Sequence, residues 1–261
     1  MIGNKTIWIT GASSGIGAEL AMQLTATGNT VVASARSADQ LLGLAALAED
    51  HPGHILPFVC DVTLDEKTAD YKSQLRELAD ELDILIICAG RCEYIDNAEL
   101  DVELFRRVYD VNVFGAVNAA SVALPLLQET AKKNNTGKPQ IVAVASLSAV
   151  TGLPRAEAYG SSKAAMIYLF NTLRLDLQKR IDVTIVNPGF VETPMTRQND
   201  FPMPFIMQPS AAAKRIIEGI EKRKLTLNFP LRLWLSLRLP SLIPSVWYRW
   251  LGPKLARTER R

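Results

Sequence analysis

Short apolar runs alternate with amphipathic stretches along the first two-thirds of the chain. The runs are rich in Val and Ile and occupy residues 6–10, 30–35, 55–60, 84–89, 140–146 and 182–187. Uninterrupted apolar runs of this length predict strands that are buried on both faces. The stretches between them have helical spacing: Leu20 and Leu24, for example, share one face, and Gly28 follows the end of that helix.

This alternation of strand and helix predicts an α/β fold. Parallel strands need crossover connections, so helices should cover both faces of one doubly wound, Rossmann-like parallel sheet. No linker or repeat divides the chain. We therefore expect one domain over residues 1–223, with a substrate lid at 194–209 and an extension at 224–261.

The first predicted strand runs into a glycine-rich turn, "ITGASSGIG" at 9–17, which contains Gly11, Gly15 and Gly17. Glycine tolerates positive φ and lets a pyrophosphate approach the backbone, and the N–H groups of the next helix then face the anion. A plain turn would also explain a lone glycine run. The strand before it and the helix after it favour a phosphate cradle at the carboxyl edge of the sheet.

The end of the second strand indicates which dinucleotide the cradle binds. An acid there would accept hydrogen bonds from the adenosine ribose and repel a 2′-phosphate. The sequence instead has Ala35 followed by Arg36. A guanidinium with no acid in that position favours the 2′-phosphate, and therefore NADP(H) over NAD(H). A solvated surface charge is the alternative explanation of Arg36.

A second motif lies in "SLSAVTGLPRAEAYGSSKAA", residues 146–165. Tyr159 and Lys163 are one helical turn apart, and a neighbouring ammonium should lower the pKa of a phenol, which is about 10 in water. Ser146 ends the fifth predicted strand, where its hydroxyl can bind a substrate oxygen. Each residue alone is unspecific, but together behind a phosphate cradle they predict proton transfer to or from a substrate oxygen.

From residue 6 to about 223 the chain closely resembles the short-chain dehydrogenase/reductase family in its single-domain form. The shared motifs are "TGASSGIG" (10–17), "CDV" (60–62), "CAG" (88–90), "NVFG" (112–115), Ser146, "YGSSK" (159–163) and "NPGFVET" (187–193). The resemblance implies an oxidoreductase that interconverts a carbonyl and an alcohol with a nicotinamide cofactor, for which Arg36 favours NADP(H). It also suggests a homodimer or homotetramer through the helices that start near Asn112 and Tyr159.

Individual roles follow from the same resemblance. Tyr159 would be the general acid or base, Lys163 would lower its pKa and hold the nicotinamide ribose, and Ser146 would orient the substrate oxygen. Asn112 would bind a water of a proton relay. Besides Tyr159 and Lys163, the cofactor contacts would come from the cradle, the adenine and ribose pockets and the carboxamide pocket: Gly11, Ser13, Ser14, Gly15, Ile16, Gly17, Arg36, Asp61, Val62, Ala89, Gly90, Pro188, Gly189, Val191 and Thr193.

Two positions depart from the family pattern. Cys88 stands where the family has an asparagine that helps tie the central strands together, so we expect this change to affect stability more than chemistry. The polar loop at 132–139 is longer than in most members. Neither departure touches the four proposed catalytic residues.

The composition indicates in which cellular compartment the protein resides and whether it binds a metal. The chain is 48% apolar and 21% charged, which is ordinary for a soluble globular protein. Two histidines, His51 and His54, are too few for a metal site, and three cysteines fit free thiols in a reducing compartment. The N-terminal residues do not resemble a secretory signal. We expect no metal and a cytoplasmic protein.

The lid and the extension carry the remaining signals. The lid is strongly apolar, which favours a lipophilic substrate, although these side chains could merely pack on the body. Residues 222–261 hold ten Lys/Arg and one acid, so this segment carries +9 and the rest −7 of the net +2. Arg, Leu and Trp mixed in 227–261, with helix-breaking prolines, slightly favour contact with an anionic membrane over a subunit contact or a pocket cover. Nothing resembles a nucleic-acid recognition module.

Two other functions remain open. A non-catalytic NADP-binding regulator would keep the fold but should have lost catalytic residues, and all four are present. A nucleotide-sugar epimerase or dehydratase would use the same Tyr and Lys, but usually needs a larger C-terminal substrate domain than this chain offers.

Overall fold

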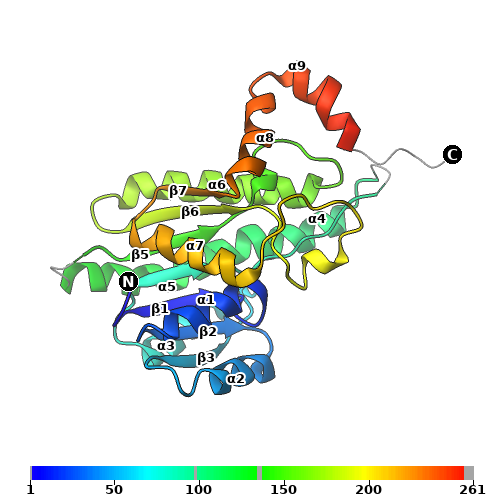
Figure 1. Ribbon diagram of the computed structural model, residues 1–261. Helices are drawn as coiled ribbons and strands as arrows, with labels where there is room; N and C mark the ends of the chain where they lie inside the picture. The colour runs from blue at the N-terminus through cyan, green and yellow to red at the C-terminus, as the bar shows by residue number, and fades with distance from the viewer. Residues whose placement is uncertain (1, 97–98, 134–136, 256–261) are drawn as a thin grey trace.

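The computed structural model describes residues 2–96, 99–133 and 137–255 and contains one parallel sheet (Figure 1). Residues 134–136 of the polar loop and 256–261 of the extension lie outside the described residues. The strand order is β3-β2-β1-β4-β5-β6-β7, and every neighbouring pair is parallel. The strands are β1 (Thr6–Thr10), β2 (Thr30–Ala35), β3 (His54–Val59), β4 (Ile84–Ile87), β5 (Gln140–Val144), β6 (Asp182–Pro188) and β7 (Thr226–Phe229).

Helices cover both faces of this sheet because successive strand residues point to opposite sides. On one face, Ile7 and Ile9 of β1 pack with α1 (Gly15–Thr25), α2 (Ala38–Leu47) and α7 (Pro209–Glu221). On the other face, Trp8 packs with α3 (Thr68–Leu78), α5 (Gly115–Lys133) and α6 (Glu157–Leu177). The predicted doubly wound Rossmann-like fold is confirmed.

The connections carry shorter elements. A π-helical turn, Asp110–Phe114, joins α4 (Val102–Tyr109) to α5. The stretch Val102–Lys133 is apolar and long enough to cross a membrane by length and composition, but half of its most apolar window is buried in the protein. Most of its apolar residues on α5 belong to the core on the face of the sheet that holds Trp8: Ala116, Ala119, Ala120, Val122, Ala123, Leu126 and Leu127. Short 3₁₀ turns lie at Asp65–Lys67, Leu147–Ala149 and Thr196–Gln198.

The six predicted strands are present, each with its ends within two residues of the prediction. The seventh strand is new: β7 pairs with β6 from Thr226 to Phe229, so the sheet continues beyond residue 223, where we expected the domain to end. The rest of the extension forms α8 (Leu231–Ser241), α9 (Pro244–Val246), a π-helical turn (Trp247–Leu251) and a 3₁₀ turn (Gly252–Leu255). In Figure 1, α8 and α9 stand away from the sheet beyond β6 and β7.

Candidate active site

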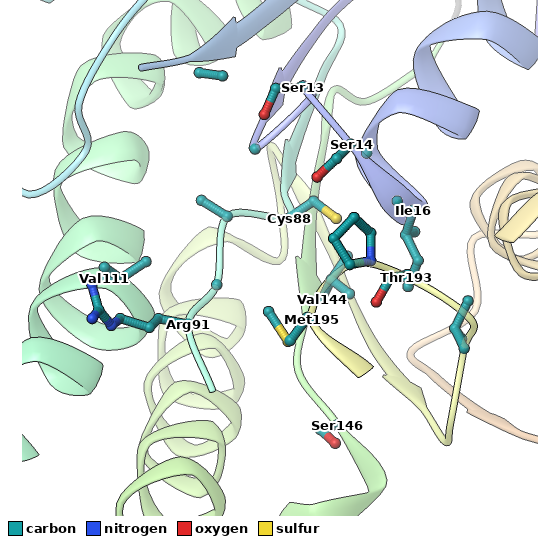
Figure 2. A pocket seen from close by; sticks show the side chains of 18 of the residues that line it. Ser13, Ser14, Ile16, Cys88, Arg91, Val111, Val144, Ser146, Thr193 and Met195 are labelled. Atoms are coloured by element: carbon teal, nitrogen blue, oxygen red, sulfur yellow. The ribbon is translucent and has the colours of Figure 1, made fainter. Parts of the chain in front are cut away.

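A cavity of about 380 Å³ opens at the carboxyl ends of β1, β2, β3, β4, β5 and β6. This is the edge where an α/β sheet binds its ligands. In Figure 2, Ser13 and Ser14 lie at one end of the cavity and Ser146 lies at the other. Every residue that the sequence assigned to the cofactor lines it: Gly11, Ser13, Ser14, Gly15, Ile16, Gly17, Arg36, Asp61, Val62, Ala89, Gly90, Tyr159, Lys163, Pro188, Gly189, Val191 and Thr193.

The glycine-rich turn has the geometry of an anion cradle. Gly11 has φ +68°, and a Cβ there would lie 2.7 Å from the Cα of Ala89. Gly15 has φ +56°, and a Cβ there would lie 2.9 Å from Cγ2 of Thr193. Both positions therefore require glycine. The first N–H groups of α1 receive no side-chain cap from Ser14, so they are free to bind an anion at the cavity wall.

The adenosine end is shaped by the carboxyl ends of β2 and β3. The carboxylate of Asp61 accepts hydrogen bonds from the backbone N–H of Thr63 (3.0 Å) and from its hydroxyl (2.8 Å), which fixes its orientation. Ala35 and Arg36 line the cavity at the end of β2, where no acid is present. A donor set with a guanidinium and no carboxylate at this point fits a 2′-phosphate.

Ser146, Tyr159 and Lys163 line the other part of the same cavity. Ser146 caps a 3₁₀ turn: its Oγ accepts the N–H of Ser148 at 3.1 Å, and its hydroxyl also interacts with the Tyr159 phenol. Tyr159 and Lys163 project from neighbouring turns of α6, with the ammonium 5.9 Å from the phenol ring centroid. The Lys163 ammonium also donates to the carbonyl of Val144 at 3.0 Å.

The ionisation of Tyr159 differs from our expectation. Burial raises its pKa above the usual phenol value, and interaction with the Ser146 hydroxyl opposes this only in part. Burial also lowers the pKa of Lys163 to about 8. The predicted lowering of the tyrosine pKa is therefore wrong for the protein without ligands, because desolvation of the buried phenol is the largest effect on it. At neutral pH the phenol is protonated and the ammonium is mostly charged.

Asn112 is brought to the site but does not line the cavity; its neighbour Val111 does. Its buried amide accepts the N–H of Arg91 (2.8 Å) and donates to the Arg91 carbonyl (2.9 Å) and to the Ser162 hydroxyl (2.9 Å). Asn112 thus ties the loop after β4 to α6. Its predicted part in a water relay stays a prediction.

We expected Cys88 to weaken the hydrogen bonding that joins the central strands, but this hydrogen bonding comes from another residue. The Thr10 hydroxyl accepts the N–H groups of Cys88 (3.1 Å) and Ala89 (3.2 Å), which joins the end of β1 to the end of β4. Burial raises the pKa of the Cys88 thiol to about 11, so it is not a thiolate. All three cysteines are free. Within residues 2–96, 99–133 and 137–255, no three His, Cys, Asp or Glu side chains cluster as metal ligands would.

An aromatic cluster that the sequence did not reveal joins the loop after β4 to the lid. Tyr94, in the loop after β4, meets Phe201 of the lid edge-to-face at 5.3 Å, and Phe201 also contacts Phe190 at 6.1 Å. The guanidinium of Arg155 lies 5.3 Å from the centre of the Tyr94 ring. Arg155 also forms ion pairs with Asp96 and with Asp200 of the lid, both at 2.8 Å. These partners are far apart in sequence, so only the fold shows them together.

A Rossmann sheet with a dinucleotide cradle and a Ser-Tyr-Lys group at its carboxyl edge defines a class of oxidoreductases. The family model for "short chain dehydrogenase" matches residues 5–202. An uncharacterized oxidoreductase of Myxococcus xanthus is 33% identical over 242 residues, 92% of this chain and 93% of that one. The chain belongs to the short-chain dehydrogenase/reductase family and is an oxidoreductase of that family.

Solved structures share the fold. A short-chain dehydrogenase from Burkholderia cenocepacia in complex with NADP has a TM-score of 0.80 at 24% identity, over 98% of this chain and 99% of that one. A short-chain dehydrogenase/reductase from Burkholderia phymatum in complex with NAD has a TM-score of 0.82 at 19% identity, over 93% and 95%. Relatives of this fold therefore bind either dinucleotide, and the choice must come from this chain's own residues.

Proposed function

We propose that this protein is an NADP(H)-dependent enzyme that interconverts a carbonyl and an alcohol on a lipophilic substrate. The observation that carries the proposal is one cavity with an uncapped helix N-terminus at one end and Ser146, Tyr159 and Lys163 in its other part. When bound, NADP(H) supplies or accepts the hydride. The protein binds the cofactor and the substrate, orients them and exchanges the proton.

The three side chains divide that work. The Ser146 hydroxyl donates a hydrogen bond to the substrate oxygen and orients it beside the phenol. Tyr159, protonated at neutral pH, gives its proton to this oxygen as negative charge develops there. The charged Lys163 then stabilises the phenolate that is left. In the oxidation of an alcohol the same proton moves in the reverse direction.

The substrate class is argued from the apolar side chains of the lid and of the segment before it. Phe190 and Phe201 form part of the aromatic cluster, and Met195 of the lid lines the cavity. These side chains offer apolar contact and few hydrogen bonds, which suits a lipophilic carbonyl compound and not a sugar phosphate. The intact catalytic group argues against a non-catalytic regulator. The C-terminal residues form a short strand and short helices, which argues against a nucleotide-sugar enzyme.

Arg36 provides the test of cofactor choice. Replacing Arg36 by Ala should raise the KM for NADPH roughly ten- to hundredfold, because a charge-assisted hydrogen bond to the 2′-phosphate contributes about 1.5–3 kcal/mol. The KM for NADH should change little. Steady-state kinetics with both cofactors measures the split, and Arg91→Ala, which removes another cation from the cavity wall, serves as the control. Equal KM changes for NADPH and NADH in Arg36→Ala would contradict the assignment.

A further inference from the structure

The segment 231–255, called here the C-terminal arm, begins with α8 in an unusual pattern. Its sequence "LRLWLSLRL" places a leucine at every second position. In a strand this spacing would give one apolar face, but in a helix it distributes leucines over two opposite faces. Leu233 and Leu237 face inward and pack with Leu147 and Trp247.

The opposite face of α8 has no partner within the described residues. Leu231, Leu235, Leu239 and Leu242 are separated by four, four and three residues, so they lie along one side of the helix. Their exposed fractions are 59%, 37%, 59% and 59%. A helix that only faced water would carry polar residues along this side.

The exposed apolar surface continues beyond α8. Large apolar side chains of the remaining arm are also exposed: Ile243, Val246, Tyr248, Trp250, Leu251 and Leu255. Single exposed apolar residues are normal on soluble proteins, whereas a gathering of this kind marks an interaction surface. Figure 1 shows α8 and α9 projecting from the domain.

The charge of this surface indicates the partner's chemistry. Residues 222–255 contain seven Lys/Arg and no acid, while the rest of the protein is acidic. The cations of the arm, Arg232, Arg238, Arg249 and Lys254, form no salt bridge within the described residues. Unpaired cations interspersed with exposed Leu and Trp match a surface that is both anionic and apolar beneath its charges.

We propose that the C-terminal arm docks the protein on the surface of an anionic lipid bilayer. The arm would lie in the interface, because α8 has 11 residues and is only about 16 Å long, against an apolar thickness of about 30 Å. The leucines favour lipid over nucleic acid, whose phosphate backbone would leave them in water. In a cell, an anionic cytoplasmic leaflet supplies such a surface.

The arm also adjoins the active site. Leu233 packs so closely on the turn after β6 that a Cβ on Gly189 would lie 2.7 Å from its Cδ2. Leu147, which follows Ser146, belongs to the same apolar cluster. Docking would therefore hold this side of the site near the bilayer. Docking itself does not depend on the proposed activity.

Vesicle co-sedimentation of the full-length protein without cofactor or substrate tests the proposal. We expect binding to phosphatidylcholine vesicles that contain phosphatidylglycerol at low salt, at least about tenfold weaker binding to pure phosphatidylcholine, and release at high salt. The tryptophan emission of the bound protein should shift to the blue, and Trp250→Phe should remove most of this shift because Trp250 is 69% exposed.

Matched variants separate the arm from a general change in charge. Leu239→Glu/Leu242→Glu should weaken vesicle binding at least about tenfold. Leu42→Glu/Leu47→Glu, on α2, adds the same charge at equally exposed leucines and should retain binding. Circular dichroism verifies that both variants fold.

Three results would overturn the proposal. One is the absence of binding to anionic vesicles at low salt. Another is equal loss in the two double variants. The third is a stable oligomer that only Leu239→Glu/Leu242→Glu dissociates, with vesicle binding unchanged, which would show that a second copy covers the arm.

Discussion

At the scale of single residues, the site holds two ionisable groups in forms that suit their proposed work. Tyr159 keeps its proton because burial raises the pKa of the phenol, and Lys163 keeps most of its charge at neutral pH although burial lowers its pKa to about 8. A buried ammonium that donates only to the Val144 carbonyl and, weakly, to the Met166 thioether within the described residues costs folding free energy. The buried charge that the proposed chemistry requires therefore lowers the free energy of unfolding by a measurable amount.

Lys163→Met should make the protein without ligands more stable at pH 7. Between pH 8 and about 10.5 the unfolded chain binds more protons at this residue than the folded chain, so the free energy of unfolding of the parent rises with pH. Below pH 8 the buried charge costs on the order of 1–3 kcal/mol. Urea unfolding should show this gain for the variant at pH 7 and a smaller one at pH 10. A variant less stable than the parent at pH 7 would contradict the reasoning.

At the scale of elements, the C-terminal arm is attached to the domain through a few inward side chains. Trp247 is 3% exposed, and its indole N–H donates to the carbonyl of Gly152 at 3.0 Å. Leu233 and Leu237 pack in the same cluster. The arm thus has a packed inner face and the exposed outer face described above.

Trp247→Ala should lower the free energy of unfolding by about 3 kcal/mol, since it removes a buried aromatic side chain and leaves the Gly152 carbonyl without its donor. Trp250→Ala removes the same chemical group from an exposed position and should change stability by less than about 0.5 kcal/mol. Urea unfolding of both variants measures the difference. Similar values for the two would show that the inner face is not packed as described.

The elements also show how far the sequence could predict the structure. Strands β1 to β6 and the contacts of the cradle depend on local patterns, such as the turn at 9–17, and were predictable. Strand β7 has only four residues and no long apolar run, so nothing local indicated it. The alternating leucines of α8 could not show which face packs inward.

Contacts between distant segments could not be predicted from the sequence for a different reason. Arg155 meets Asp96 and Asp200 only because the loop after β4 and the lid come together in the fold. The Thr10 hydroxyl replaces the tie expected at residue 88 because β1 lies beside β4. The pKa of Tyr159 depends on burial, which spacing along a helix does not reveal.

At the scale of the whole molecule, exposed apolar side chains also occur on the two helices through which we expect an oligomer to form. Phe114 and Val117 are exposed where α5 begins, and Tyr168 and Leu175 are exposed on α6 at 78% and 67%. These are the two helices through which the family resemblance predicts a dimer or tetramer. Covering these side chains would remove apolar area from water.

Tyr168→Glu/Leu175→Glu should therefore convert a dimer or tetramer into a smaller species, because a buried contact would have to accept two charges per chain. Size-exclusion chromatography with light scattering gives the mass of the parent and of the variant. Leu42→Glu/Leu47→Glu again provides the control and should keep the parent mass. A parent that is monomeric would refute the predicted association.

The central claim is that Tyr159 transfers the proton in an NADPH-linked carbonyl reduction, and one comparison tests it most directly. NADPH oxidation by the parent and by Tyr159→Phe is measured against ketones and aldehydes from short and polar to long and apolar, together with the Kd for NADPH. We expect turnover that rises with the apolarity of the substrate, a loss of about 100- to 10,000-fold in Tyr159→Phe, and an NADPH Kd within about twofold of the parent. Turnover that survives in Tyr159→Phe would show that Tyr159 does not transfer the proton.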